Sequence, residues 1–210
     1  MTFDEQTLTR GERTRQAILS AAEKLFLANG YHGTSVRQIA RAAHVALGGI
    51  YNHFSSKGDI FKAVLEEQNP YWKAVEALDG IEGSSGPEML AEAFGRLLSF
   101  ARENVDYFAL ALTDMREFEG RTIRVLVADA IPGILRFAGR VEAAGGLRRD
   151  VDHLILMRLF ASLLIGYMFT DLIAYSDEQP VLPGMPSSQQ ARAGVQDILL
   201  HGVAAREDGA

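Results

Sequence analysis

A short stretch near the N-terminus carries small and hydrogen-bonding side chains on one face of an expected helix. These residues are Gly48, Gly49, Asn52 and His53. The opposite face presents Ile50 and Phe54 to a core at i, i+4 spacing. Each glycine lowers helix stability by roughly 0.5 to 1 kcal/mol relative to alanine, so the presence of two glycines here requires an explanation. Two adjacent small residues let a helix backbone lie close to the wall of a DNA groove, and the alternative is a fraying helix.

Two short helices joined by a tight turn are expected to position this face. The first has three apolar residues at i, i+3 and i+4, namely Val36, Ile39 and Ala40. Ser35 followed by Gln38 forms a capping box at its start, where Thr34 is a competing N-cap. After a turn at residues 43–46, the second helix is expected over residues 47–54. This arrangement predicts a DNA-binding head.

The segment A-x-V-x-x-G-x-I-Y-x-H-F-x-S-K-x-x-I-F, residues 43–61, resembles the helix-turn-helix of the TetR family of transcriptional repressors. The resemblance extends upstream through residues 13–35, where a helical apolar stripe ends at an Asn29-Gly30 cap. It covers about the first 65 residues. The resemblance implies an all-α fold, with a three-helix DNA-binding head and a larger helical body for ligand binding and dimerisation.

The resemblance also implies roles for individual residues. Phosphate contacts fall to Tyr51, His53, Lys57 and Ser35, and such contacts position a protein without reading sequence. Base contacts fall to Arg37, Gly48, Gly49 and Asn52, because asparagine can pair with adenine and arginine with guanine. The chain departs from the family pattern at Ala46, where a capping serine or threonine is common, and at Leu47, where lysine is frequent. The alternative for Tyr51 and His53 is an aromatic pair that closes the head's core.

Charge and composition support a division into two domains, residues 1–58 as arm and DNA-binding domain and residues 59–210 as effector-binding and dimerisation domain. Residues 1–58 contain seven Lys and Arg against four Asp and Glu, while the remainder contains fourteen against twenty-three. A basic head on an acidic body orients the molecule toward DNA. The absence of cysteine excludes a disulfide framework and a thiolate metal site and fits the cytoplasm. Residues 1–12 lack a signal peptide's apolar stretch, and the longest uncharged run of the C-terminal region, Leu159 to Thr170, is too short to span a membrane.

The body is expected to be helical throughout, without a β pattern. A long connector is expected over residues 60–78, followed by a loop over residues 80–87. Further helices are expected to end near Glu103 and to cover residues 106–115, 121–144, 152–175 and 187–205. Pro132-Gly133 should kink the 121–144 helix, and Gly145-Gly146 should end it.

The helix over residues 152–175 is apolar almost all round, so it must be covered on several sides. A second copy of the protein is expected to supply part of that cover through a four-helix bundle with the last helix. The expected interface residues are Leu163, Tyr167, Val195 and Leu199. The alternative is an ordinary buried helix in a monomer.

A small-molecule effector is expected among the body helices, because ligand pockets are mostly apolar and a kink at Pro132 leaves space. The expected lining residues are Phe94, Phe108, Leu112, Met115, Phe137, Met157 and Phe160. Arg116 or Arg158 could orient an anionic end of the ligand. The alternative is that these aromatic and methionine residues are plain core.

No enzyme, metal or cofactor pattern stands out. The five histidines are scattered, and Asp150, Asp152 and His153 lie at an expected helix start, where carboxylates cap. Together with the family resemblance, the sequence is interpreted as that of a homodimeric repressor, released from a near-palindromic operator by a small apolar or amphipathic effector. The alternatives are a helix-turn-helix regulator without a small-molecule ligand, and an all-α interaction module that binds no DNA.

Overall fold

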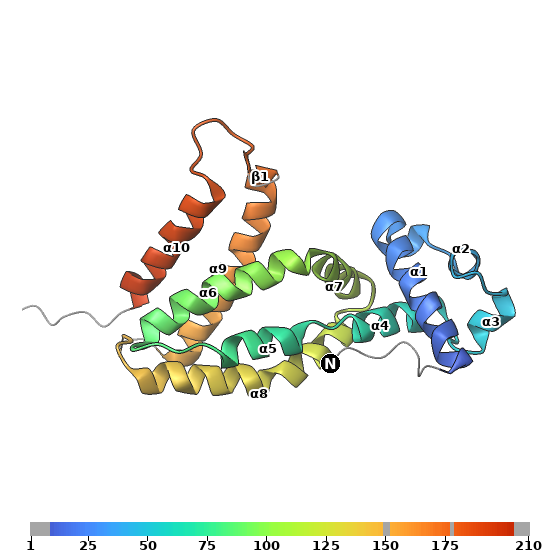
Figure 1. Ribbon diagram of the computed structural model, residues 1–210, viewed down its shortest axis with the longest axis horizontal. Helices are drawn as coiled ribbons and strands as arrows, with labels where there is room; N and C mark the ends of the chain where they lie inside the picture. The colour runs from blue at the N-terminus through green and yellow to red at the C-terminus, as the bar shows by residue number, and fades with distance from the viewer. Residues whose placement is uncertain (1–8, 149–151, 177–178, 204–210) are drawn as a thin grey trace, which may run out of the picture. The chain divides into compact units, whose positions relative to one another are not determined.

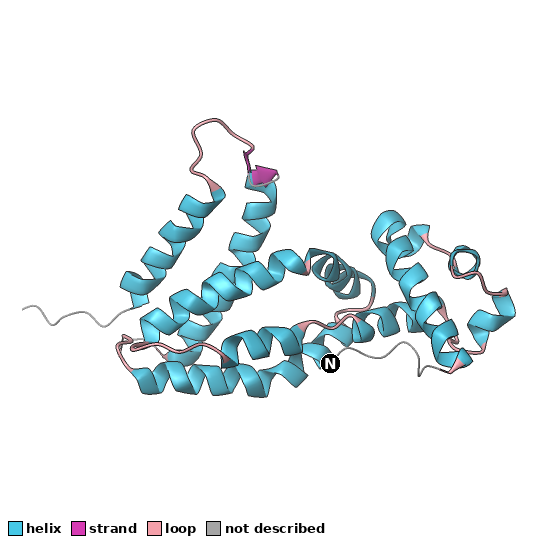
Figure 2. Cartoon of the chain, in the orientation of Figure 1, coloured by secondary structure: helices cyan, strands magenta, loops and turns pink. Residues whose placement is uncertain are grey.

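The computed structural model describes residues 9–148, 152–176 and 179–203, which fold almost entirely into α-helices (Figure 1). In chain order the helices are α1 (Arg10–Gly33), α2 (Val36–Ala42), α3 (Leu47–Tyr51), α4 (Lys57–Glu67), α5 (Tyr71–Asp79), α6 (Gly86–Glu103), α7 (Val105–Glu117), α8 (Arg121–Ala144), α9 (His153–Ala174) and α10 (Ser188–Val203). The all-α prediction is confirmed. What it did not anticipate is a pair of two-residue antiparallel strands, β1 (Tyr175–Ser176) and β2 (Gln179–Pro180), between α9 and α10 (Figure 2).

The chain divides into two compact units. The first, here called the head unit, comprises Met1–Pro70 and Val105–Ala128, and therefore holds α1 to α4, α7 and the start of α8. The second, called the body unit, comprises Tyr71–Asn104 and Asp129–Ala210. This division differs from the boundary between residues 58 and 59 expected from the sequence, because α4 and α7 both pack with the head.

The head unit has a small apolar core whose centre is aromatic. Ile39, Ile50 and Ile60 are fully buried in it. Phe26 meets Phe61 edge to face at 5.1 Å, and Phe118, which follows α7, stacks on Phe61 at 5.4 Å. Ring pairs at these distances contribute roughly 0.5 to 1.5 kcal/mol beyond their buried area, so α7 contributes to the stability of the head.

Two helix ends in the head are set by identifiable residues. Gly30 has φ 71°, a left-handed conformation that breaks α1 where the Asn29-Gly30 cap was predicted. Ser56 caps α4 by accepting a hydrogen bond from the Asp59 amide at 3.1 Å.

The single connector predicted over residues 60–78 is wrong. The chain forms two helices instead, because α4 ends at Glu67 and α5 begins at Tyr71. Pro70 explains the break, since proline lacks the amide hydrogen that a continuous helix needs and disfavours helical geometry at Asn69. The proline ended the helix although the apolar periodicity continued beyond it.

The body unit is organised around a core in which α5, α6 and α8 meet. Its buried residues are Leu78, Ile81, Met89, Leu90, Ala93, Phe137, Val141 and Leu147. Gly133 allows the close approach of α5 and α8, because a Cβ atom there would lie 2.3 Å from Val75. Arg140 secures the end of α5 by donating hydrogen bonds to the carbonyl oxygens of Leu78 and Ile81 at 2.6 and 3.1 Å. α8 runs on through Pro132, and Gly145 and Gly146 follow its end with positive φ as expected.

α9 begins where the carboxylates were expected to cap. The Asp152 side chain accepts a hydrogen bond from the Ile155 amide at 3.3 Å, whereas Asp150 lies outside the described residues. In the part of the chain that the structure describes, neither α9 nor any other helix has the length and apolar character to cross a membrane.

Candidate nucleic-acid interface

The start of α2 is fixed by reciprocal hydrogen bonds. Ser35 accepts from the Gln38 amide at 3.3 Å, and the Gln38 side chain accepts from the Ser35 amide at 2.8 Å, which confirms the predicted capping box. Thr34, the competing candidate, is buried and donates its hydroxyl to the carbonyl oxygens of Leu25 and Gly30. Thr34 thus closes the end of α1, while Ser35 stays exposed on the surface.

The turn between α2 and α3 depends on an unusual backbone conformation. His44 has φ 56°, in the left-handed region that non-glycine residues seldom adopt. The Val45 amide donates to the Ala40 carbonyl at 3.0 Å, which closes the turn. The imidazole of His44 is consequently exposed between the two helices, a position that no local sequence pattern indicated.

α3 is shorter than the sequence predicted. It covers five residues, Leu47–Tyr51, and Asn52 caps its end, so Asn52 and His53 lie just beyond the helix. Ala46 makes no side-chain cap, as its methyl group requires. Ile50 is fully buried and Phe54 is 7% exposed, and these two side chains anchor α3 to the head.

The outer side of α3 is open. A Cβ atom added at Gly48 would meet no described atom within 4 Å, and one at Gly49 would meet Val45 Cβ at 3.8 Å. Packing within the chain therefore does not require either glycine. A close approach, if it is the reason for them, must come from outside the molecule.

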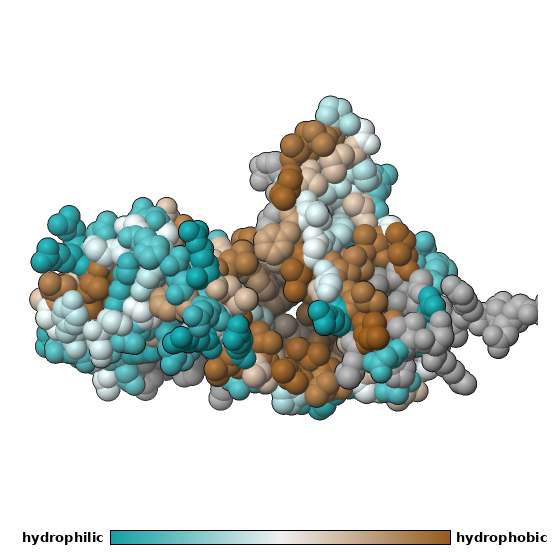
Figure 3. Space-filling model, turned by 180° about the vertical axis from the view of Figure 1, so that it is seen from behind, coloured by the Kyte–Doolittle hydropathy of each residue, from teal (hydrophilic) through white to brown (hydrophobic). Residues whose placement is uncertain are grey.

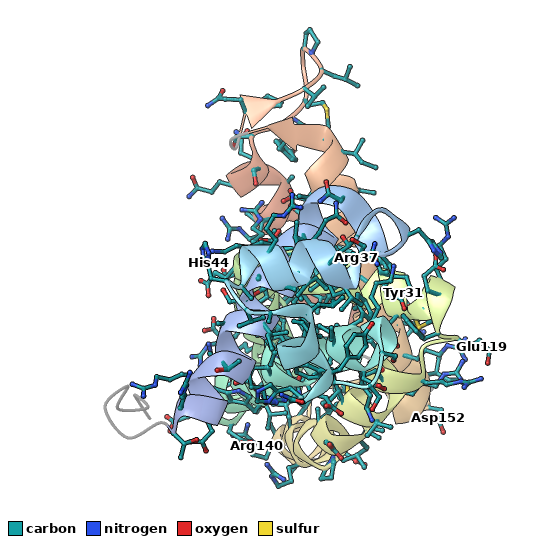
Figure 4. The ribbon with its side chains drawn as sticks, turned by 90° about the vertical axis from the view of Figure 1, so that its right-hand side faces the viewer. Tyr31, Arg37, His44, Glu119, Arg140 and Asp152 are labelled. Atoms are coloured by element: carbon teal, nitrogen blue, oxygen red, sulfur yellow. The ribbon has the colours of Figure 1, made fainter. Side chains whose placement is uncertain are left out.

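Most of the predicted contact residues lie on the surface of the head. Ser35, Arg37, Gly48, Tyr51 and Asn52 are exposed, whereas Gly49 and His53 are half-buried. Tyr51 is 56% exposed, so it does not close the core, and the alternative proposed for it is wrong. Figure 4 labels Arg37 on α2 and His44 at the turn that follows. Arg41, which the sequence analysis did not single out, is also exposed on α2.

Lys57 differs from its neighbours because its ammonium group is held inside the head. Its Nζ donates to the carbonyl oxygens of Tyr31 and Thr34 at 2.6 and 2.7 Å and lies 4.2 Å from the centre of the Tyr31 ring. Two of its three hydrogens are thereby used in joining the end of α1 to the start of α4. The role of Lys57 in the structure is to position the helix-turn-helix.

The seven residues predicted to line an effector pocket fall into both units. Phe94 and Phe137 are buried in the body unit, where Met157 and Phe160 pack against the core. The other three are on α7 in the head unit, and two of them, Leu112 and Met115, are 50% and 52% exposed. Phe137 is part of the body core, as the plain-core alternative predicted. Arg116 is exposed and pairs with Glu117 at 3.3 Å.

The surface of α9 is apolar, as its sequence indicated. The large exposed residues of this helix are Ile155, Leu159, Leu163, Ile165, Phe169 and Ile173. In Figure 3, brown marks hydrophobic residues on the part of the body unit that contains α9. Among the predicted interface residues, Leu163 is 37% exposed and Tyr167 and Val195 are half-buried. The side chain of Leu199 lies outside the described residues.

A polar group that the sequence analysis missed joins α6, α9 and α10. Arg102 on α6 binds the carboxylate of Asp171 on α9 and donates to the Ser188 hydroxyl at 2.7 Å. Burial raises the pKa of Tyr167, one helical turn before Asp171, and the nearby carboxylate raises it further. Asp171 and Ser188 lie 69 and 86 residues after Arg102 in the sequence. No local sequence pattern could therefore have indicated that these three side chains meet.

Comparisons with known proteins agree with this geometry. Residues 18–64 match the model of the family described as bacterial regulatory proteins, tetR family. The transcriptional regulator UidR of Escherichia coli K12 is 31% identical over 165 residues, covering 76% of this chain and 82% of UidR. The regulator HbdR of Aromatoleum sp. strain CIB is 33% identical over 149 residues, and the match spans 69% of this chain but only 64% of HbdR. A crystal structure of a tetR-family regulatory protein from Rhodococcus RHA1 has a TM-score of 0.65 at 17% identity over 95% of this chain and all of that one, a likeness of fold.

Proposed function

The chain belongs to the TetR family of DNA-binding transcriptional regulators, and from this premise we propose that it is a homodimeric repressor of a near-palindromic operator. In this proposal a small apolar or amphipathic effector releases the repressor from DNA. Binding DNA as a member of this family requires no catalytic group, and the exposed residues of α2 and α3 suit recognition rather than catalysis.

The observation that carries the proposal is the open face of α3. Gly48 costs helix stability, and nothing within the described chain occupies the space that its missing side chain leaves. The missing side chain lets the backbone of α3 approach the wall of a DNA groove, so that α3 lies deeper against the base edges. This close approach would explain the loss of helix stability. Arg37 on α2 and Asn52 at the end of α3 are exposed and carry the donors and acceptors that read guanine and adenine.

We assign phosphate contacts to Tyr51, His53 and Ser35, and base contacts to Arg37, Asn52 and the backbone of the two glycines. Leu47 is 37% exposed at the first position of α3, where an apolar side chain suits a thymine methyl group better than a phosphate. Lys57 is left with one free ammonium hydrogen for a phosphate, so we assign it mainly to holding α4 in place.

Dimerisation supports the proposal from a separate direction. A five-residue helix reaches few base pairs, so useful affinity needs two half-sites read by two copies. The apolar side chains exposed on α9 form a surface that a second copy would cover, and a two-fold axis would bring α9 and α10 of both copies together.

For the effector we propose the apolar region of the body unit around Phe94, Phe160 and Tyr167. The Phe94 ring meets Phe160 at 6.4 Å and Tyr167 at 5.5 Å, both edge to face. A ligand among these rings must favour the arrangement in which the heads no longer fit adjacent half-sites, since equal binding to both states shifts nothing. One observation favours the runner-up, a regulator without a small-molecule ligand: Phe94 is 0% and Phe137 3% exposed, as in a packed core.

The experiment that tests the proposal is selection of operator sequences from a random pool of double-stranded DNA with the purified full chain. We expect a two-fold symmetric consensus with half-sites about one helical turn apart. Recovery of no consensus would favour an interaction module that binds no DNA. Titration of apolar and amphipathic compounds against the selected operator then separates an effector-responsive repressor from one without a ligand.

A further inference from the structure

The turn between α2 and α3 carries a side chain where glycine would fit with less strain. His44 has φ 56° there, and among the residues that the structure describes Glu119, at φ 57°, is the only other non-glycine residue with a positive φ. Figure 4 labels both residues. Histidine enters the left-handed region more readily than most residues, but glycine does so without the clash of a Cβ atom. The backbone of this turn therefore does not explain why position 44 is a histidine.

Contacts within the chain do not explain the histidine either. Backbone groups close the turn, because the Val45 amide donates to the Ala40 carbonyl oxygen at 3.0 Å. The amide of His44 itself donates to the Arg41 carbonyl oxygen at 3.2 Å. The imidazole is exposed and makes no hydrogen bond or ion pair within the described part of the chain. Its ring nitrogens are consequently available to a partner outside the protein.

The place of the turn in the helix-turn-helix indicates what that partner is. In this motif the first helix crosses the DNA backbone and the second helix lies in the major groove. A side chain on the turn between them therefore lies beside the sugar-phosphate backbone at the edge of the groove, and not over the base edges inside it. An imidazole N–H group can donate to a phosphate oxygen there, whether the ring is neutral or protonated.

The neighbouring part of the recognition surface is short of such donors. Phosphate contacts supply much of the affinity of DNA-binding proteins. The first turn of α3, residues 47–50, consists of apolar side chains and glycines, and Ala46 before it offers no hydroxyl group. Lys57 uses two of its three ammonium hydrogens within the head. His44, three residues before α3 begins, supplies a hydrogen-bond donor that the start of α3 lacks.

We propose that the imidazole of His44 donates a hydrogen bond to a phosphate of the operator. This contact rests on the proposed function, since it requires a DNA duplex against α2 and α3. The family resemblance assigns no role to the residue, because position 44 is left open in the A-x-V pattern that begins the motif. His44 thus adds a contact of this chain's own to those assigned to Ser35, Tyr51 and His53. A glycine at position 44 would relieve the strain but leave the phosphate without this donor.

Two replacements in the full chain separate the side chain from the backbone. His44→Gly removes the imidazole and the strain, whereas His44→Asn removes the imidazole but keeps a shorter side chain that tolerates the left-handed conformation. Both variants should bind the selected operator and an unrelated duplex about three- to tenfold more weakly than wild type in fluorescence anisotropy, because a phosphate contact carries no sequence information. His44→Gly should at the same time unfold at a higher urea concentration than wild type.

Glu119→Gly is the matched control, because it relieves the same backbone conformation in the turn between α7 and α8. It gives up only an exposed pairing with Arg121 at 3.3 Å, so it should raise the urea midpoint without weakening DNA binding. Wild-type affinity in both His44 variants, or a loss confined to the operator, would overturn the phosphate contact. A loss in His44→Gly alone would also overturn it, since the rigidity of the turn would then be responsible. If the wild type itself binds no DNA, the proposed function fails together with this contact.

Discussion

The recognition surface on α2 and α3 and the apolar surface of α9 are both exposed, but they are built in opposite ways. The recognition surface consists of small or polar residues on short helices that caps and turns hold in place, and Gly48 leaves space on it. The α9 surface consists of large apolar side chains on a helix of 22 residues. The first suits contacts that depend on salt concentration, and the second suits contact that persists.

The largest expected effect comes from placing charge on the α9 surface. Leu159→Glu combined with Leu163→Glu should weaken dimerisation by about 100-fold or more, on the order of 3 kcal/mol, because two unpaired carboxylates would be buried between the copies. Sedimentation analysis measures the effect. Ser162→Glu, on the same helix and also exposed, is the control for charge alone and should change the dimer less. A wild-type protein that is monomeric at micromolar concentration, with or without DNA, would remove the two-half-site explanation.

Base reading should show a smaller effect that depends on sequence. Asn52→Ala and Arg37→Ala should each relax the preference at one base pair in every half-site, at roughly 1 to 3 kcal/mol for a good bidentate contact. Selection from a random DNA pool measures this. Arg13→Ala removes the same charge from an exposed position on α1 and should leave the consensus intact. An unchanged consensus for the Asn52 and Arg37 variants would mean that other groups read the bases.

Phosphate contacts should show an effect that is uniform across sequences. Tyr51→Phe removes only a hydroxyl group from a side chain that is 56% exposed, so the fold should be unaffected. Binding should weaken by about 1 kcal/mol to operator and unrelated DNA alike, because a phosphate contact carries no sequence information. Fluorescence anisotropy on both DNAs decides the matter, and a loss confined to the operator would assign Tyr51 to base reading.

The smallest expected effect separates stability from recognition. Gly48→Ala should raise the free energy of unfolding by roughly 0.5 to 1 kcal/mol, because alanine favours the helix and its Cβ meets no described atom within 4 Å. The same variant should bind its operator more weakly. Gly139→Ala in α8, also with open space around it, is the matched control and should stabilise without changing DNA affinity. If Gly48→Ala bound DNA as well as wild type, the glycine would serve no close approach.

The two surfaces also differ in how far the sequence predicted them. The helix-turn-helix depends on signals that act over three or four residues, such as Ser35 with Gln38, and these were predicted correctly. Its C-terminal limit was missed, because α3 ends at Tyr51 although the apolar spacing continues to Phe54. The packing of Lys57 into the head was not predicted, since its partners Tyr31 and Thr34 lie 26 and 23 residues upstream.

In the body, apolar periodicity identified the helices. It could not show which apolar side chains would be buried against other helices of the same chain and which would stay exposed. Phe137 and Leu112 both occupy helical apolar positions, yet the first is 3% and the second 50% exposed. The difference depends on which helices fold beside them, which no pattern along one helix contains. The break at Pro70 could have been predicted, because a single residue type accounts for it.

The contact between Tyr31 and Phe118 sets a rule for exchanging recognition heads between related regulators. A chimera joined at residue 58, after the last predicted DNA-contact residue, would keep Tyr31 from the donor but take Phe118 and Phe61 from the recipient. The donor Tyr31 would then face a foreign residue at position 118, where the native rings lie 5.0 Å apart, and the native hydrogen bond between His32 and Glu117 would be lost as well. A graft that carries α7 and residue 118 together with α1 to α4 keeps these contacts. The unit that can transfer DNA specificity to another regulator is therefore made of two segments that are separate in the sequence.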